Sequence, residues 1–390
     1  MSLRRLQSLL MLVLALAIAG SAACEWVGEA DGTVSPGYAC LGTVCLGTEC
    51  LGYYTGDERS FEAVQDFAEY LTIVSADVYA VEFDGTITGG DDFGVVAFCK
   101  ANGIEAYACV SNYNSDPDVG SFDAELARAA IVTHREVVID GLTSLAVGGG
   151  YDGVNVDFEN LAYSDDIDDD RAAFTAFIHE LAERLHALGL KLAISVPGKT
   201  EDSIDDDWSY PFDYSTLDKD ADLLQLMTYD QHGPWSEPGP VSGADWVEDC
   251  VAYAVSVVDP AKLLIGLPAY GYDWDLTDSD PASWTYSATS FSWGGTAALL
   301  AQPGAIEGWD TASQSPFVTY IERGHWHEAW FENAASLRAK TALIAEYHLA
   351  GLSMWSLGQE DAAFWEEALA SAASASAASA ATASAEPALP

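Results

Sequence analysis

Two kinds of hydrophobic pattern alternate along most of this 390-residue chain. Short apolar runs, some with strict period-two alternation, predict β-strands at residues 51–55, 72–83, 105–113, 154–158, 191–196, 223–229, 263–267 and 351–355. Longer stretches with apolar residues three or four positions apart predict helices at residues 61–70, 93–101, 123–145, 171–188 and 334–347. Strands and helices therefore follow one another for about 300 residues.

Eight predicted strands, nearly all followed by helices, favour an α/β fold whose architecture is a (β/α)8 TIM barrel over residues 49–367. A doubly wound parallel sheet is the alternative, but no glycine-rich phosphate loop follows the first strand. An irregular section at about residues 275–318 interrupts the pattern. It predicts a small insertion after strand seven.

The fourth predicted strand has one apolar and one polar face. In YDGVNVDFE, residues 151–159, apolar side chains alternate with Asn155, Asp157 and Glu159, and successive side chains of a strand point to opposite faces. A surface strand would show the same pattern, with its polar face in water. In a barrel, the carboxyl ends of the strands carry the chemistry, so these side chains are predicted to line the barrel mouth. Neighbouring acids separate each other's pKa values, which helps to keep Glu159 protonated as a general acid.

Aromatic and polar residues also gather at the ends of the other predicted strands. They are Tyr53, Asn112, Tyr113, Met227, Tyr229, Asp230, Tyr270, Tyr272, Trp274 and Trp355. Core packing explains any one of them taken alone. Their shared position at one rim predicts a cleft with aromatic platforms, which suits sugar rings.

The charge balance narrows the range of partners. Lys and Arg total 15 against 61 Asp and Glu, which gives a formal net charge of −46 at pH 7. This field repels phosphate and therefore excludes nucleic acid and anionic membrane surfaces. A neutral sugar polymer is compatible with it. His325 and His327 resemble half of a metal site, but no third ligand stands near them, so we expect a solvated strand there and no metal.

Residues 1–23 predict a secretory signal peptide, because Arg4 and Arg5 precede an apolar run that ends in small residues. A membrane-spanning anchor is the alternative, but the run is short for one. Cys24 stands where a lipidated cysteine would follow cleavage, although Ser21 fits that motif poorly. A membrane tether is therefore expected only if Cys24 is lipidated. The expected location is outside the cell or in the cell envelope.

The flanking segments differ in composition from the predicted barrel. Residues 24–48 are a Cys/Gly-rich linker, and residues 368–390 are an Ala/Ser-rich tail predicted to be disordered, with a helical alanine run as the alternative. Without Cys24, six cysteines remain, an even number that suits disulfides in an oxidising compartment. They are Cys40, Cys45, Cys50, Cys99, Cys109 and Cys250. The spacing of the first three favours a local disulfide knot over metal ligands, while the overall pairing stays open.

The motifs together resemble one enzyme family. Residues 151–159 match every position of the active-site pattern of glycoside hydrolase family 18, the chitinase family. The resemblance continues through LGYYTG from residue 51, MTYD at 227–230, GLPAYGYDW at 266–274 and SMWSLG at 353–358. The surroundings MTYDQHGPWSEPGPV and SPFVTY are most similar to a bacterial branch that includes spore-cortex N-acetylglucosaminidases.

The resemblance implies a glycoside hydrolase that cleaves β-1,4 linkages next to N-acetylglucosamine with retention and without an enzymic nucleophile. Glu159 would protonate the glycosidic oxygen and later act as the base. Asp157 would orient the acetamido group of the substrate, supported by Tyr53, and Tyr229 would hydrogen-bond the acetamido carbonyl. No metal or organic cofactor is implied.

The resemblance also implies a set of substrate-binding residues. Met227 and Asp230 would shape the pocket, Trp355 would form its floor, and Tyr53 and Asn155 would lie behind it. Asn155 stands where many chitinases have a third acid, so the proton relay would be shorter and the pH optimum could move.

Several alternatives stay open in the sequence. The second hypothesis for the function is a non-catalytic, lectin-like barrel that binds chitin or peptidoglycan, although such relatives typically lose the acid that Glu159 provides. A purely structural envelope protein would leave the aromatic rim unexplained. Spore-type relatives usually carry wall-binding modules before the barrel, and residues 24–48 are too short for one. A monomer is expected, whereas the identity of the glycan and the choice between chain-end and internal cleavage are not predicted.

Overall fold

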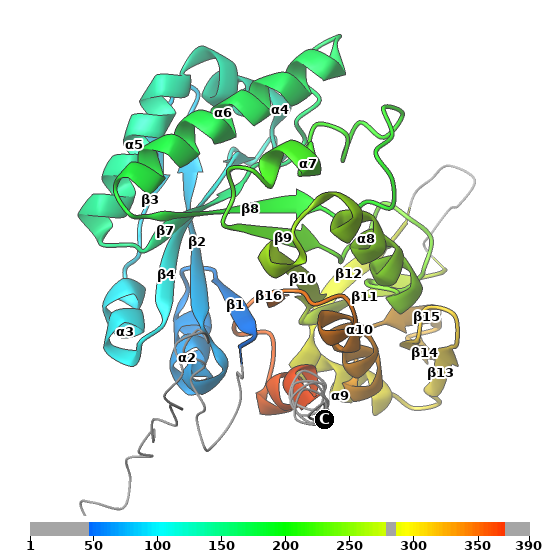
Figure 1. The fold of residues 1–390 in the computed structure, drawn as a ribbon. Helices are drawn as coiled ribbons and strands as arrows, with labels where there is room; N and C mark the ends of the chain where they lie inside the picture. The colour runs from blue at the N-terminus through cyan, green and yellow to red at the C-terminus, as the bar shows by residue number, and fades with distance from the viewer. Residues whose placement is uncertain (1–46, 278–285, 371–390) are drawn as a thin grey trace, which may run out of the picture.

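A closed barrel of parallel strands forms the centre of the chain in a computed structural model that describes residues 47–277 and 286–370 (Figure 1). Its strands are β1 (Glu49–Tyr54), β2 (Ile73–Val81), β4 (Glu105–Ser111), β7 (Gly153–Asp157), β8 (Lys191–Pro197), β9 (Leu223–Met227), β10 (Leu263–Pro268) and β16 (Gly351–Trp355). They pair in the order β1-β16-β10-β9-β8-β7-β4-β2, and pairing between β1 and β2 closes the ring. The predicted TIM barrel is confirmed.

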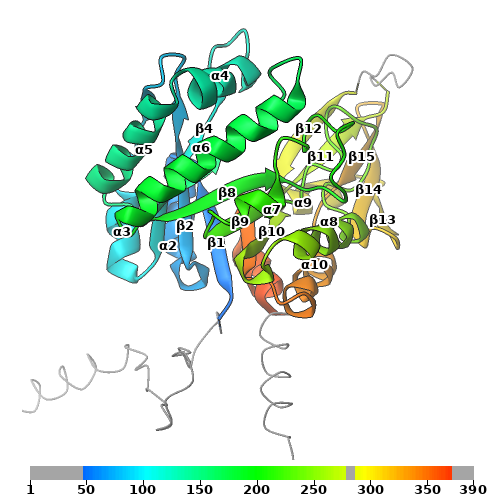
Figure 2. The ribbon, with the colours of Figure 1, turned by 45° about the horizontal axis from the view of Figure 1, so that its top comes forward.

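Helices surround the barrel on its outside (Figure 2). They are α2 (Glu58–Asp66), α3 (Val95–Asn102), α4 (Ala124–Arg128), α5 (Arg135–Gly149), α6 (Ile167–Ala187), α7 (Tyr214–Leu217), α8 (Ala244–Val257) and α10 (Ala334–Glu346). The helix predicted over 123–145 is divided, because a π-helical turn, Ala129–Thr133, separates α4 from α5. Three short strands lie outside the ring of eight. They are β3 (Ile87–Gly89), which pairs with β2, and the two-stranded sheet of β5 (Tyr113–Asn114) and β6 (Ser121–Phe122).

The two faces of β7 enter different environments, as its alternation predicts. Val154, Val156 and Phe158 belong to the large core between strands and helices. The Phe158 ring stacks on Phe177 of α6 with a centroid distance of 5.7 Å. Asn155 and the other inward side chains point into the barrel. The surface-strand interpretation is therefore wrong.

The barrel interior combines a small apolar cluster with buried polar side chains. A small apolar cluster that includes Tyr53, Tyr107 and Cys109 fills part of it. Buried polar side chains occupy the same interior, namely Ser75, Asn155, Ser195, Gln225 and Ser353. A polar layer thus lies directly beneath the carboxyl ends of the strands.

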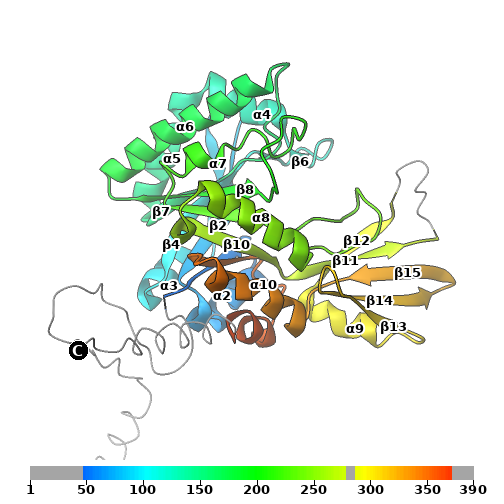
Figure 3. The same ribbon diagram turned by 45° about the vertical axis from the view of Figure 1, so that its right-hand side comes forward.

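The predicted insertion is an antiparallel sheet that stands to one side of the barrel, following β10 (Figure 3). Its strands are β11 (Tyr270–Asp275), β12 (Ala288–Ser292), β13 (Ile306–Asp310), β14 (Ser315–Glu322) and β15 (His325–Trp330), in the order β12-β11-β15-β14-β13. The short helix α9 (Thr296–Leu300) joins β12 to β13. The sheet takes in residues on both sides of the irregular section at 275–318. It has a small core of its own around Val318 and Tyr320.

The cysteines contradict part of the disulfide prediction. Cys99, Cys109 and Cys250 are free, buried thiols. The outer core holds Cys99 and the barrel interior holds Cys109, so these side chains serve as small apolar groups in separate layers. Burial, with smaller contributions from nearby carboxylates, raises the pKa of the thiols of Cys99 and Cys250 to about 12, which keeps them protonated. Cys24, Cys40 and Cys45 lie outside the described residues.

The predicted terminal segments fall mostly outside the described residues, which exclude residues 1–46 and 371–390. A helix over residues 362–370 buries Ala368 and Leu369 against the core, so the packed chain runs into the start of the predicted tail. Across residues 47–277 and 286–370, the helices fall short of the length and apolarity that crossing a membrane requires.

Alkylation tests the state of the three thiols. We expect Cys99, Cys109 and Cys250 to stay unmodified by iodoacetamide in the native protein and to react fully in denaturant without reductant, because they are buried but unpaired. Peptide mass mapping measures each site separately. Recovery of any of these three cysteines in a disulfide-linked peptide would contradict the structure.

Candidate active site

Glu159 follows the end of β7, and its backbone is held at two points. The side chain of the buried Asn112 donates from Nδ2 to the Glu159 carbonyl oxygen at 2.8 Å and accepts from the Glu159 N–H at Oδ1, also at 2.8 Å. Asn160 comes next with φ 57°, a left-handed conformation that non-glycine residues rarely adopt. Such strain persists where the surroundings fix it, and it is common at functional sites. The two hydrogen bonds from Asn112 therefore limit the positions that the Glu159 carboxyl group can reach.

Asn155 is the centre of a buried hydrogen-bond network beneath the mouth. Its Oδ1 accepts from the Tyr53 hydroxyl and from Ser75 Oγ, each at 3.0 Å, and its Nδ2 donates to Ser195 Oγ at 3.1 Å. The Tyr53 hydroxyl also lies 3.0 Å from Ser195 Oγ and 3.3 Å from Gln225 Oε1. The Tyr53 hydroxyl thus contacts Asn155, Ser195 and Gln225 directly. A neutral amide satisfies these groups without adding a negative charge to the interior.

The acids near the mouth have strongly altered pKa values. Burial, and then the Asp77 carboxylate, raise the pKa of Asp157 to about 7. Burial, and then Asp157, Asp230 and Asp77, raise the pKa of Glu159 well above its usual range. Within the described part of the chain, Asp157 Oδ1 is buried with no hydrogen-bond partner. The site therefore combines Glu159, whose protonated form is favoured by burial and by its acidic neighbours, with an unsatisfied buried acceptor.

Asp77 is a residue of this site that the sequence analysis missed. It lies on β2 and pairs in register with Cys109 of β4, beside a β-bulge that shifts the register before Tyr79. Burial raises the pKa of Asp77 to about 6. The sequence carried a signal, since Asp77 is the charged residue of the otherwise uncharged strand IVSADVYAV. A carboxylate in a buried strand is costly unless it is used.

A cavity of about 540 Å³ opens beside Glu159. It is lined by Glu159, Pro197, Gly198, Trp208, Met227, Tyr229, Asp230, Trp235 and Trp246. The predicted Met227, Tyr229 and Asp230 are therefore brought together with Glu159. The tryptophans were missed because they stand on loops and on α8 instead of on strand ends. Trp208 is 45% exposed and Trp235 58% exposed, so both offer ring surface to a ligand.

Two tyrosines of the inserted sheet hold Asp230 in place. Tyr270 and Tyr272 donate their hydroxyls to Asp230 Oδ1 at 2.6 Å and 3.1 Å. Asp230 has φ 59°, so it repeats the left-handed conformation that follows Glu159. The ring of Tyr229 meets that of Tyr270 edge-on, with centroids 6.4 Å apart. The inserted sheet thus fixes one wall of the cavity.

Two further predicted features lie around this wall. Trp355 stands half-buried at the end of β16, with its ring centroid 5.2 Å from that of Tyr53. His325 Nδ1 lies 2.6 Å from Asp275, and His327 Nδ1 lies 3.2 Å from Asp273. These pairs join neighbouring strands β15 and β11. Groups of three or more His, Cys, Asp or Glu spaced for a metal are absent from the described ranges.

Comparison with known proteins agrees with this arrangement, since residues 52–360 match the family described as glycosyl hydrolases family 18. This chain belongs to glycosyl hydrolases family 18. It is a glycoside hydrolase, and the resemblance read from its motifs is confirmed.

Individual relatives support the assignment. The uncharacterized glycosylase YvbX of Bacillus subtilis is 33% identical over 317 residues, which cover 80% of this chain and 88% of the relative. The cortical fragment-lytic enzyme of Bacillus subtilis is 27% identical over 310 residues, covering 76% and 67%. Among solved structures, a chitinase from Chromobacterium violaceum is 36% identical with a TM-score of 0.74, covering 82% of this family 18 hydrolase and 98% of that chain.

Gly266 of β10 is required for the position of Tyr229. A Cβ at this position would stand 2.4 Å from the Leu226 carbonyl oxygen and 2.7 Å from the Tyr229 ring. We expect Gly266→Ala to lower the free energy of unfolding by about 1–3 kcal/mol through overpacking, measured by urea denaturation. Gly90→Ala is the matched control, because a Cβ there meets nothing within 4 Å. Equal stability of the two variants would contradict this packing.

Proposed function

We propose that this family 18 hydrolase cleaves β-1,4 linkages next to N-acetylglucosamine by substrate-assisted, retaining catalysis. The observation that carries the proposal is the buried Asp157 Oδ1, which no donor within the described ranges satisfies. An acetamido N–H of a bound sugar would provide that donor. Glu159 lies two residues further along the chain, and burial followed by its acidic neighbours raises its pKa well above the usual range, which favours the protonated form that a general acid needs.

In the first step, Glu159 gives its proton to the glycosidic oxygen as the bond to the anomeric carbon breaks. The acetamido oxygen of the same sugar attacks that carbon and forms a cyclic oxazolinium intermediate. Asp157 accepts the acetamido N–H and stabilises the positive charge that develops on the nitrogen. Tyr229, on the cavity wall, donates its hydroxyl to the acetamido oxygen.

In the second step, the leaving sugar departs and Glu159 is a carboxylate. It takes a proton from an incoming water, whose oxygen attacks the anomeric carbon and reopens the ring of the intermediate. Two inversions at that carbon give net retention. This scheme needs one carboxyl group for proton transfer and none for nucleophilic attack, as in other substrate-assisted glycosidases.

The substrate we propose is a chitin oligosaccharide or peptidoglycan. The names of the relatives support both, since one is a chitinase and another is a cortical fragment-lytic enzyme. Of the two, chitin is the neutral chain and suits a protein with a net charge of −46. Trp208, Trp235 and Trp246 would stack on successive sugar rings, and Trp355 would lie beneath the cleaved one. Action outside the cytoplasm belongs to the same proposal and depends on the signal-like residues 1–23.

Replacement of the acid tests the mechanism. Glu159→Gln is expected to lower kcat on chitooligosaccharides or on purified peptidoglycan by about 10²–10⁴-fold, because the amide cannot donate the proton. Exposed Glu62 of α2 provides the matched control, and Glu62→Gln should behave as wild type. NMR of the first product should show the β-anomer. The mechanism is wrong if wild type cleaves neither substrate or if Glu159→Gln keeps full activity, and tight binding without cleavage by wild type would favour the lectin-like alternative.

The pH profile tests the influence of Asp77. Its negative charge raises the pKa values of both Asp157 and Glu159. Removing that charge lowers both, so Asp77→Asn should move the acidic and the alkaline limbs of kcat/KM to lower pH by about one pH unit. Asp140→Asn on the outside of α5 removes the same charge and should leave the profile in place. A shift toward higher pH, or none, would contradict the role of Asp77.

A further inference from the structure

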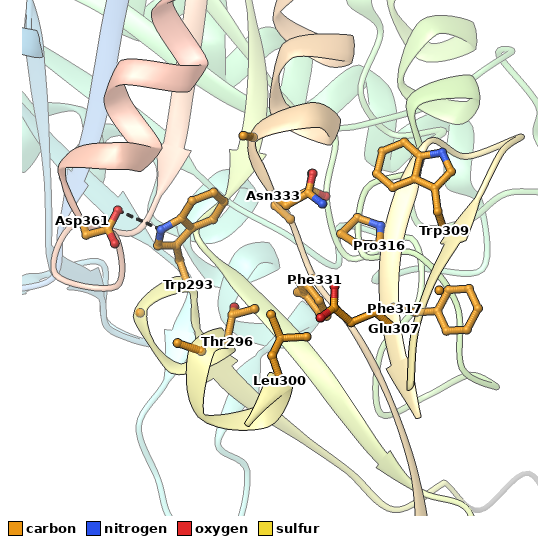
Figure 4. A pocket seen from close by; sticks show the side chains of 15 residues that line it. Trp293, Thr296, Leu300, Glu307, Trp309, Pro316, Phe317, Phe331, Asn333 and Asp361 are labelled. Carbon is orange, nitrogen blue, oxygen red and sulfur yellow. Dashed lines mark hydrogen bonds between the residues drawn. The ribbon is translucent and has the colours of Figure 1, made fainter. Parts of the chain in front are cut away.

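A second cavity, of about 600 Å³, lies where the inserted sheet meets the barrel (Figure 4). Strand β13, helix α9, the start of α10 and the loop after β16 contribute to its walls. None of its lining residues also lines the cavity beside Glu159. A volume of this size is within the range of small-molecule binding sites, about 300–1,000 Å³.

Aromatic rings form part of this second cavity, and one of them is firmly held. Trp293 donates its indole N–H to Asp361 Oδ1 at 2.9 Å (Figure 4). Its ring also meets that of Phe364 edge-on, with centroids 5.3 Å apart. Trp309, on β13, is 40% exposed, and the buried Phe331 is a further aromatic residue of the lining. Rigid rings that keep a face open lose little entropy when a ligand packs on them.

Two of the residues that line the second cavity, Glu332 and Thr296, carry a buried polar atom without a partner among the described residues. Glu332 is only 3% exposed, and its Oε2 accepts from Lys340 Nζ and Ser336 Oγ, each at 2.5 Å. Its Oε1 has no hydrogen-bond partner among the described residues, and the same is true of Thr296 Oγ1. A buried polar atom without a partner is costly, and a bound ligand with donor groups would remove that cost.

These features together select a class of ligand. The unsatisfied carboxylate oxygen needs a hydroxyl or amide donor, and the exposed Glu307 and Asp361 at the rim are acceptors as well. Anions are excluded by these acids and by the net charge of −46. Lys340 already neutralises Glu332, so a cation has no uncompensated charge to bind there. Apolar faces combined with several donors are the chemistry of a neutral saccharide.

We propose that this cavity is a second saccharide-binding site, which takes an N-acetylglucosamine unit of the polymer at a place apart from the cavity beside Glu159. The identity of the sugar rests on the proposed function, while the existence of the site rests on its own contacts. The site holds an insoluble chain against the enzyme and thereby raises the local concentration of linkages near Glu159.

Binding to insoluble chitin tests this proposal in a Glu159→Gln background, where cleavage does not interfere. Trp309→Ala is expected to weaken binding to colloidal chitin by about ten-fold, because a stacking platform is lost. Trp326→Ala is the matched control, since Trp326 is a more exposed tryptophan, at 58%, of the same inserted sheet and lines neither cavity. Its binding should equal that of the parent.

A second readout separates this site from the catalytic one. With Glu159 intact, Trp309→Ala should keep kcat and KM on soluble chitotriose and lose rate only on colloidal chitin. Equal chitin binding by Trp309→Ala and Trp326→Ala, or equal competition for the Trp309-dependent binding by cellotriose and chitotriose, would overturn the proposal. If the parent binds chitin through Trp309 but wild type cleaves neither chitotriose nor colloidal chitin, the second site stands and the proposed function fails.

Discussion

Negative charge enclosed at the carboxyl ends of the barrel strands is the constraint on which this structure depends. Asp77, Asp157, Glu159 and Asp230 all lie around one mouth, and burial opposes the ionisation of each. Four ionised carboxylates there would repel one another in a medium of low dielectric constant. This repulsion is reduced when some of the acids are protonated. Burial first, and then the neighbouring carboxylates, favour the protonated form of Glu159.

Asn155 limits the number of negative charges near the mouth. An acid at this position would add a further charge below Asp157, whereas the amide joins Tyr53, Ser75 and Ser195 without one. Asp77 contributes a carboxylate from a neighbouring part of the interior, next to Cys109 on the adjoining strand. Burial, followed by Asp77 and Asp157, holds the pKa of that thiol well above its usual range, so it stays neutral. The influence of a third acid therefore comes from β2 in this chain and not from β7.

The sequence predicted the barrel and the centre of the site because both rest on local patterns. Alternation placed Asn155, Asp157 and Glu159 on one face, and strand counting put that face at the mouth. Asp77 was missed because its importance depends on which strands become neighbours, which period-two patterns do not show. Trp208, Trp235 and Trp246 were missed for a similar reason, since loops and helix ends reach the cavity only after folding. The disulfide prediction failed at Cys99, Cys109 and Cys250 because counting cysteines ignores the layers that separate them.

The closure of the barrel has a consequence for how the chain reaches its active form. β16 lies between β1 and β10, and its pairing with β1 joins Glu49 to Gly351. Contacts between residues so distant in sequence form slowly, because a long loop must close before they are made. The ring and the wall that carries Trp355 are complete only when the last strand has arrived. The sealed interior that alters the acid pKa values is therefore a property of the finished barrel, and a chain that stops before β16 has the acids without the environment that makes them reactive.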